Sequence, residues 1–277
     1  ILPALVSQLT ASKLALGLIP AIDSLGFLLP QLLVANYTEG LRRKLPFVAT
    51  VSSFGERGPY LLMALAVWWL AQPSPTVTLV VLFALLIVHT ASGGIVTPAW
   101  LDLIAKVIPA RRRGLWFGVS HGLGAFFGVA GAALAGWVLV TQPYPRNFAM
   151  CFLLAFLALV VSWVWLVLNR EPDSAATKTR TPLRTYFAQL PEVLRRDRNY
   201  VRFLLARTAI ALGATATEFY TVYGIERWSI GGAEVALFTA ILTSSEAIMN
   251  GAWGLVGERY GHKVVLASGA AILSLAT

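Results

Sequence analysis

Residues 76–105 read TVTLVVLFALLIVHTASGGIVTPAWLDLIA, and this stretch decides the fold class. Its one charged residue is Asp102, near the end. About 20 apolar residues in a helix cross a bilayer, so the stretch is long enough to span one. The rest of the chain repeats the pattern, with whole segments expected at about 14–38, 46–71, 76–105, 114–140, 147–169, 200–224 and 233–256.

The composition agrees with a membrane protein. Of the 277 residues, 57% are apolar and 13% are charged, about half the charged share of a soluble domain. Such hydrophobicity excludes disorder, and the long blocks without alternation disfavour a strand barrel. The single Cys151 allows no intrachain disulfide. We predict an all-α integral membrane protein with about nine segments. The first, at residues 1–9, and the last, from about 264, are incomplete, as in a partial chain.

The loops alternate in charge. One set holds 17 Lys and Arg residues and the other holds three, while Arg57 and Arg207 lie inside apolar blocks. The positive-inside rule places the basic set in the cytoplasm. We expect the protein to lie in the cell (cytoplasmic, or inner) membrane. The formal net charge of +9 then reports orientation, and no nucleic-acid partner is expected.

The longest polar stretch, residues 170–199, divides the chain. Its second part carries apolar residues at helical spacing among basic ones, namely Leu183, Phe187, Leu190 and Leu194. This pattern indicates an amphipathic helix on the inner leaflet; a plain solvated linker is the alternative. We predict an amino-terminal bundle over 1–169, a cytoplasmic linker over 170–199, and a partial second bundle over 200–277.

The sharpest local motif is GLVGERYGHK at residues 254–263, between the last two segments. It resembles the inner loop G-x-x-x-D-R-x-G-R-K of the major facilitator superfamily, with Glu258 in place of Asp and His262 in place of Arg. The loop ANYTEGLRRK at 35–44 keeps an acid and the final bases without the glycines. Two such loops, each after the second helix of its half, suggest a duplicated bundle. The alternative is that any short inner loop collects bases.

The resemblance implies an inner gate of charges that separate and re-form as two halves rock. The residues that match it are Glu39, Arg42, Arg43, Asp102, Arg113, Gly114, Gly254, Glu258, Arg259, Gly261 and Lys263. We expect Glu39 to pair with Arg113, or Asp102 with Arg42 or Arg43.

Two helices depart from the family pattern. Where the fourth helix of the family has R-x-x-q-G, this chain has His89-Thr-Ala-Ser-Gly93, so the usual arginine is replaced by a group that titrates near neutral pH. The fifth helix has a row of glycines without the Gly-Pro pair of antiporters, which favours close helix packing.

Ionisable groups inside the apolar blocks are the candidates for substrate binding or proton coupling. Each costs about 2.5–3.5 kcal/mol at a helix centre, so they should face the bundle interior or a cavity. The ionisable candidates are Asp23, His89, Glu218, Glu246 and Arg207, and the polar Asn250 is a further candidate in the same segment as Glu246. By the resemblance, Glu218 and His89 are the best placed in a central cavity.

Several of these residues have a structural alternative. Glu218 and Glu246 could form interhelical ion pairs without touching substrate, Arg207 could extend to the interface, and His121 could simply be packed. Glu56 and Arg57 are adjacent on a helix and point about 100° apart, so we expect them to satisfy a break at Gly58-Pro59.

We predict a secondary transporter that moves a small solute by alternating access, with proton coupling as a further hypothesis. The alternatives are a transmembrane subunit, a transporter-like sensor or a membrane-embedded enzyme. An enzyme is disfavoured because the chain lacks an HExxH motif, and an ATP-driven pump is disfavoured because the chain lacks a P-loop. No metal or cofactor is expected, the partners are a small-molecule substrate and the bilayer, and the transport unit is expected to be a monomer. The sequence does not identify the substrate.

Overall fold

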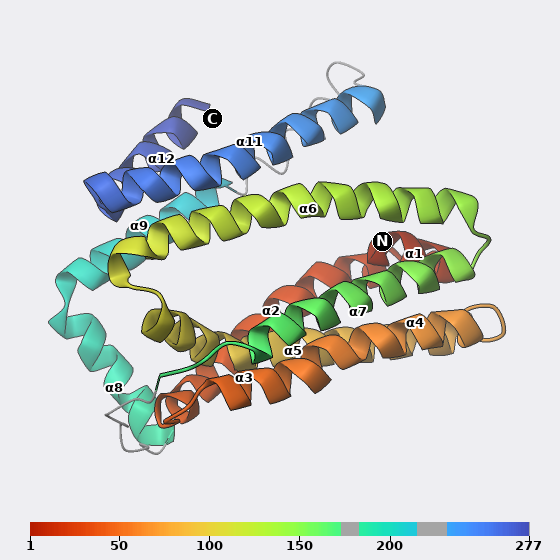
Figure 1. The fold of residues 1–277 in the computed structure, drawn as a ribbon, viewed down its shortest axis with the longest axis horizontal. Coiled ribbons are helices and arrows are strands. Elements are labelled where there is room, and N and C mark those ends of the chain that lie inside the picture. Colours follow the sequence, from red (N-terminus) through yellow and green to blue (C-terminus); the bar gives the residue numbers. More distant parts are fainter. Residues whose placement is uncertain (173–182, 215–231, 277) are drawn as a thin grey trace. The chain divides into compact units, whose positions relative to one another are not determined.

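The computed structural model describes residues 1–172, 183–214 and 232–276, and within these ranges it contains helices and no strand (Figure 1). The amino-terminal part consists of α1 (Leu2–Leu9), α2 (Lys13–Glu39), α3 (Leu45–Val51), the π-helix η1 (Ser52–Arg57), α4 (Gly58–Leu70), α5 (Pro75–Val107), the short 3-10 turn η2 (Ala110–Arg112), α6 (Arg113–Thr141) and α7 (Arg146–Val167). The later helices are α8 (Leu183–Arg196), α9 (Arg198–Ala214), α11 (Gly232–Tyr260) and α12 (His262–Ala276).

The observed helices confirm the all-α membrane fold. Four of them, within the described residues, are long and apolar enough to cross a bilayer: Lys13–Glu39, Pro75–Val107, Ala110–Thr141 and Arg146–Val167. Helix α8 lies where the amphipathic helix is expected, although its place on the membrane stays a prediction. The number of membrane segments also stays a prediction.

The span expected at 46–71 departs from a regular helix. It begins as α3, continues through the π turn Ser52–Arg57, and ends as α4. The Gly58 amide donates to the Ser53 carbonyl five residues back, the bond that defines a π-helix. Pro59 follows at once and has no amide hydrogen, so the regular α-helical ladder cannot run through this point.

Contacts divide the chain into two compact units. Unit 1 comprises residues 1–107 and 132–183, and unit 2 comprises 108–131 and 184–277. This grouping assigns the first part of α6 to the carboxyl-terminal unit, whereas the predicted bundles divide after residue 169. The predicted division into bundles stays a prediction.

Unit 1 is held together by an apolar cluster and by close helix contact. Leu5, Val67, Leu82 and Phe148 are almost completely buried in this cluster. Helices α2 and α5 form the most extensive pair, and a Cβ atom at Gly94 would overlap the Phe27 carbonyl oxygen. The missing side chain therefore lets the two backbones touch.

In unit 2, α6 packs closely on α11 through glycines on both helices. A Cβ at Gly254 would lie 2.7 Å from the Gly114 carbonyl oxygen, and one at Gly118 would press on the Asn250 carbonyl. Of the glycine row predicted for the fifth helix, Gly118 thus has a packing role, whereas a Cβ at Gly124, Gly128 or Gly131 would meet open space.

Candidate functional site

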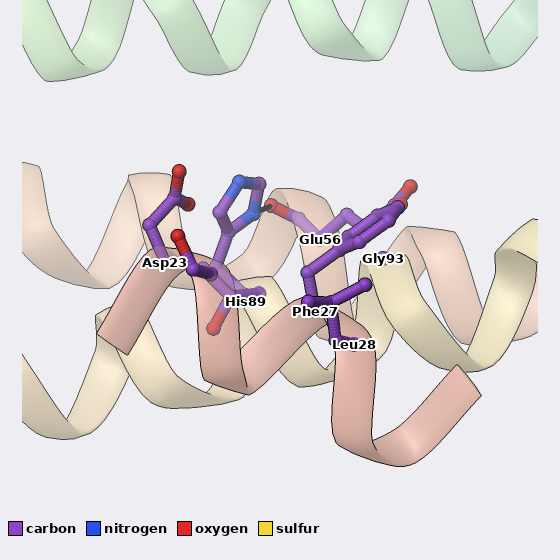
Figure 2. A pocket seen from close by; sticks show the side chains of 8 residues that line it. Asp23, Phe27, Leu28, Glu56, His89 and Gly93 are labelled. Atoms are coloured by element: carbon purple, nitrogen blue, oxygen red, sulfur yellow. Dashed lines mark hydrogen bonds between the residues drawn. The ribbon is translucent and has the colours of Figure 1, made fainter. Parts of the chain in front are cut away.

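A cavity of about 400 Å³ in unit 1 is lined by three ionisable residues that lie within apolar segments of the sequence. Its walls come from α2, the π turn and α5, and we call it the acidic cavity: Asp23, Ser24, Phe27, Leu28, Glu56, His89, Thr90 and Gly93. Figure 2 shows the Asp23 carboxylate and the His89 ring projecting to the same side of their helices.

Helical spacing explains how these side chains meet. Asp23 and Phe27 lie four residues apart on α2, and His89 and Gly93 lie four apart on α5, so each pair shares one face of its helix. Because α2 and α5 are in backbone contact at Gly94, the two faces border one space. The structure therefore brings together two predicted candidates, Asp23 and His89.

The orientation of the His89 ring is fixed by the π turn. Its Nδ1 lies 3.0 Å from the Glu56 carbonyl oxygen, and its ring meets the Tyr60 ring edge-on at 5.0 Å between centroids. A carbonyl only accepts, so Nδ1 is the donor of this hydrogen bond.

Arg57 has a structural role at the π turn. It is 7% exposed, and its Nε donates to the Leu159 carbonyl of α7 at 2.9 Å. Its Nη1 donates to the Ser52 carbonyl at 2.9 Å and to Glu56 Oε2 at 3.2 Å. Arg57 thus ties the π turn to α7 and supplies a charge partner for its neighbour.

Glu56 differs from expectation, because its carboxylate also borders the acidic cavity. The prediction treated it as a purely structural partner of the helix break. Two adjacent long side chains nevertheless reach each other across the π turn, and Glu56 still faces the cavity. The signal available in the sequence was the carboxylate itself, since acids are rare within membrane spans.

The other candidates lie elsewhere. Arg207 is exposed on α9 and Asn250 is half-buried on α11, both in unit 2. Glu246 lies on α11, but its side chain is outside the described part, and Glu218 lies wholly outside the described residues. Their roles stay predictions. In the described ranges no group of three or more His, Cys, Asp or Glu side chains could hold a metal ion.

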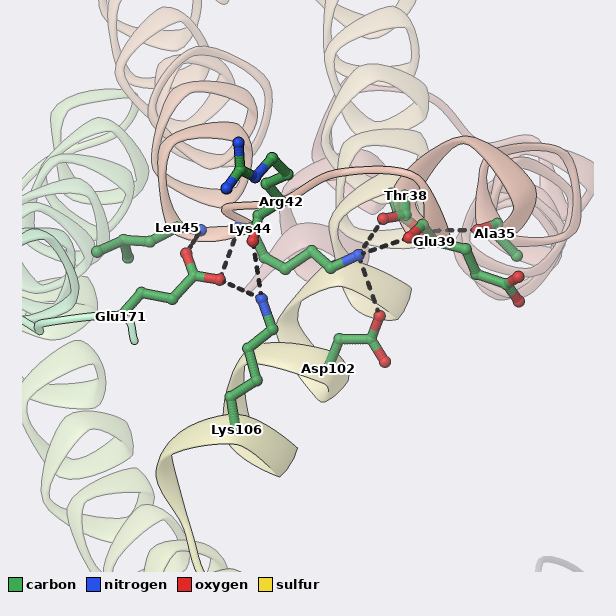
Figure 3. Close-up of polar contacts among 9 residues, drawn as sticks. All are labelled: Ala35, Thr38, Glu39, Arg42, Lys44, Leu45, Asp102, Lys106 and Glu171. Atoms are coloured by element: carbon green, nitrogen blue, oxygen red, sulfur yellow. Dashed lines mark hydrogen bonds and ion pairs between the residues drawn. The ribbon is translucent and has the colours of Figure 1, made fainter. Parts of the chain in front are cut away.

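The predicted inner-gate loop of unit 1 has a lysine at its centre (Figure 3). Lys44 is 4% exposed, and its Nζ contacts the Thr38 carbonyl, the Glu39 carbonyl at 3.3 Å and Asp102 Oδ2 at 3.4 Å. A cation at these last carbonyls of α2 is electrostatically favourable. The base that pairs with Asp102 is therefore Lys44, next in sequence to the expected arginines.

Glu171 joins this loop to the start of the linker, and the sequence interpretation missed it. Its side chain is 2% exposed and accepts hydrogen bonds from the Lys44 amide (2.8 Å), the Leu45 amide (2.7 Å) and Lys106 Nζ (2.6 Å). We call this arrangement the Glu171 clamp. Burial raises the pKa of Glu171, but these hydrogen bonds and the Lys106 charge outweigh burial and leave the pKa below its usual value.

The second gate loop lies in unit 2. Glu258 Oε1 accepts a 2.6 Å hydrogen bond from the Leu115 amide at the start of α6, where free amides and the helix dipole favour an anion. Gly114 and Gly254 make room for this approach, and Gly261 has a φ of +90°, which favours glycine. Gly114, Gly254 and Glu258, three residues of the predicted inner-gate set, thus lie together in unit 2. Glu39 and Arg113 belong to different units, so their pairing stays a prediction.

Comparison with known proteins gives one family match. The family model described as Major Facilitator Superfamily matches residues 1–277, which is the whole chain. No curated protein and no solved structure matches the chain. The family match agrees with the resemblance carried by the two inner-loop motifs.

Proposed function

Since the chain belongs to the major facilitator superfamily, we propose that it is a secondary active transporter that moves a small polar solute by alternating access. Members of this family are transporters, and the chain is a multi-pass membrane protein. The proposal concerns the mechanism, the polarity of the solute and its coupling to protons.

The observation that carries the proposal is the convergence of Asp23, Glu56 and His89 on one cavity. Each ionisable group inside a span carries an insertion cost, and three groups from three elements would rarely collect without a functional reason. Carboxylate and imidazole side chains are the groups that proteins most often use to transfer protons. This chemistry supports proton-coupled transport of a polar solute.

The gate loops support alternating access. Glu258 at the first amides of α6, and Lys44 between the end of α2 and Asp102, are charge contacts at predicted cytoplasmic helix ends. Asp102 is about half exposed and Glu258 is half-buried, so water can solvate both acids when a conformational change breaks these contacts.

The first experiment identifies the solute. A thermal-shift screen of metabolites and drugs on the purified full chain should yield a compound that stabilises it, since a ligand at 100 times its Kd adds about 2.7 kcal/mol. The Asp23→Asn variant should lose that stabilisation. Glu192→Gln, an exposed acid on α8, is the matched control and should keep it.

The second experiment measures flux in liposomes. A pH gradient should drive uptake of the identified solute, with protons moving alongside it, and Asp23→Asn should abolish this coupling. Binding without flux would instead indicate a sensor. Solute flux that carries no proton and ignores the gradient would overturn proton coupling.

We also propose that the basic loops and the linker face the cytoplasm and that a monomer is the transport unit. Cys151 is the only cysteine, so a Cys151→Ser background permits single-cysteine labelling in each loop. Cysteines beside Arg111 and beside Pro143 should be labelled from opposite sides of the membrane. Labelling of both from one side would contradict the proposed topology.

A further inference from the structure

A second cavity lies behind the π turn, on the side of α5 and α7. Its volume is about 250 Å³, and several of its lining side chains are polar: Ser52, Glu56, Arg57, Thr97, Trp100 and Ser162. We call it the rear cavity. All of its walls belong to unit 1.

Ser52 gives the first sign that this cavity binds something. The residue is 1% exposed, and its Oγ is the one buried side-chain oxygen or nitrogen without a hydrogen-bond partner in the described part of the chain. The neighbouring Arg57 bonds the Ser52 carbonyl rather than the hydroxyl. Buried hydroxyls normally have partners, so Ser52 requires one from within the cavity.

Water fits the space and its chemistry. A water molecule occupies about 30 Å³ in the liquid and needs two to four polar partners, so the cavity has room for several. Ser52 Oγ can donate and accept. Thr97 Oγ1 donates its proton to the Gly93 carbonyl at 2.7 Å, which leaves its lone pairs able to accept. Arg57 and Glu56 add charged groups that an apolar ligand would leave unsatisfied.

Glu56 connects the two cavities, because its side chain lines both of them. Its Oε2 is held by Arg57 on the rear side. Its Oε1 lies beside Gly93, 3.4 Å from where a Cβ of that residue would be, and Gly93 lines the acidic cavity. The two oxygens of one carboxylate thus face different surroundings.

We propose that the rear cavity is a water-binding site anchored by Ser52 and that Glu56 relays protons between its water and the acidic cavity. The relay rests on the proposed proton coupling; the water site does not. In the relay, an O–H bond of a hydronium in one cavity breaks as an O–H bond forms on Glu56. That bond then breaks as water in the other cavity takes the proton. Nothing is oxidised or reduced, and Arg57 keeps its charge.

The water site is tested by X-ray radiolytic labelling with mass spectrometry on the full chain in liposomes, because bound water generates hydroxyl radicals beside buried side chains. Trp100 should be labelled in the unmodified chain. In Ser52→Val, which replaces the hydroxyl and fills its space, labelling of Trp100 should fall at least threefold. Trp163, whose Nε1 donates to the Ala49 carbonyl, does not line the cavity and is the internal reference.

Thr78→Val is the matched control variant. Thr78 is completely buried on α5, its hydroxyl is bonded to the Ser74 carbonyl, and it lines neither cavity. It should leave the labelling of Trp100 unchanged. Equal labelling in Ser52→Val and in the unmodified chain would overturn the water site. If Ser52→Val does not fold, Ser52→Ala removes the same hydroxyl with a smaller change in volume, and labelling of Trp100 equal to that of the unmodified chain would again overturn the water site.

The relay has a separate readout. Ser52→Val should slow proton flux several-fold while the thermal shift given by the solute is unchanged, and Ser52→Thr should restore the flux. Reduced labelling with normal proton flux would keep the water site and overturn the relay. If the unmodified chain moves solute without protons, proton coupling and the relay fail together, while the labelling still decides the water site.

Discussion

Replacing Glu171 by glutamine should destabilise the protein although it changes only charge and hydrogen bonding. The carboxylate is 2% exposed and accepts three hydrogen bonds, from two backbone amides and from Lys106 Nζ at 2.6 Å. A glutamine retains one oxygen and places an NH₂ group against a remaining donor. Hydrogen bonds to charged groups contribute about 1.5–3 kcal/mol each, and breaking a buried pair costs about 3–5 kcal/mol. We therefore expect a loss of about 2–4 kcal/mol.

The assay is thermal unfolding of the full chain in detergent, followed by tryptophan fluorescence. For a domain of 150–250 residues, 1 kcal/mol corresponds to about 2–4 °C in Tm, so the expected decrease is about 4–16 °C. Glu192→Gln makes the same chemical change on the exposed α8 and should stay within 1 °C. A double-mutant cycle with Lys106→Met should show coupling. A decrease as small as that of Glu192→Gln, or full additivity with Lys106→Met, would refute the reasoning.

Three further predictions concern the same structure. The pKa of Glu171 is lower in the folded protein than the ordinary value of 4.5, so the stabilisation that its carboxylate gives is complete above pH 4.5 and is lost as the pH falls through the folded pKa. Acid unfolding curves should show this loss of stability, and the pH dependence of stability should be weaker in Glu171→Gln. Gly94→Ala should cost about 1–3 kcal/mol in the same thermal assay because its Cβ would overlap the Phe27 carbonyl, whereas Gly17→Ala, with open space, should cost nothing or stabilise slightly. His89→Asn, whose amide can donate in place of Nδ1, should keep the Tm but abolish the uptake of solute that a pH gradient drives; uptake equal to that of the unmodified chain would exclude His89 from coupling.

The helices were predictable because membrane spans depend mainly on the length and apolarity of local sequence. Helix α5, for instance, extends two residues beyond the expected 105 and begins one residue earlier. The π turn was not predictable, because two of its carbonyls, those of Ser52 and Glu56, bond to the side chains of Arg57 and His89, and His89 comes from another helix. Local propensity carries no such information.

The candidate site was predictable in part for the same reason. Asp23 and His89 stand out as ionisable residues within apolar blocks, and helical spacing puts each on a definite face. The role of Glu56 depends on the turn that carries it, and that of Glu171 depends on Lys44 and Leu45, 127 and 126 residues away. A contact between such distant residues leaves no periodic pattern in the sequence.

The π turn also holds one residue that a regular α-helix through the same span would not need. Its hydrogen bonds reach back five residues instead of four, so six of its residues turn the chain about as far as five residues of an α-helix, each of which turns it by about 100°. Deleting one residue between Ser52 and Arg57 would therefore convert the π turn into an α-helical turn and leave α4 nearly unrotated relative to α3. The face that buries Met63 and Val67 would stay buried, whereas the wide turn that places Glu56 against both cavities would be lost. The extra residue is thus dispensable for the packing of the span and necessary for the geometry of the site.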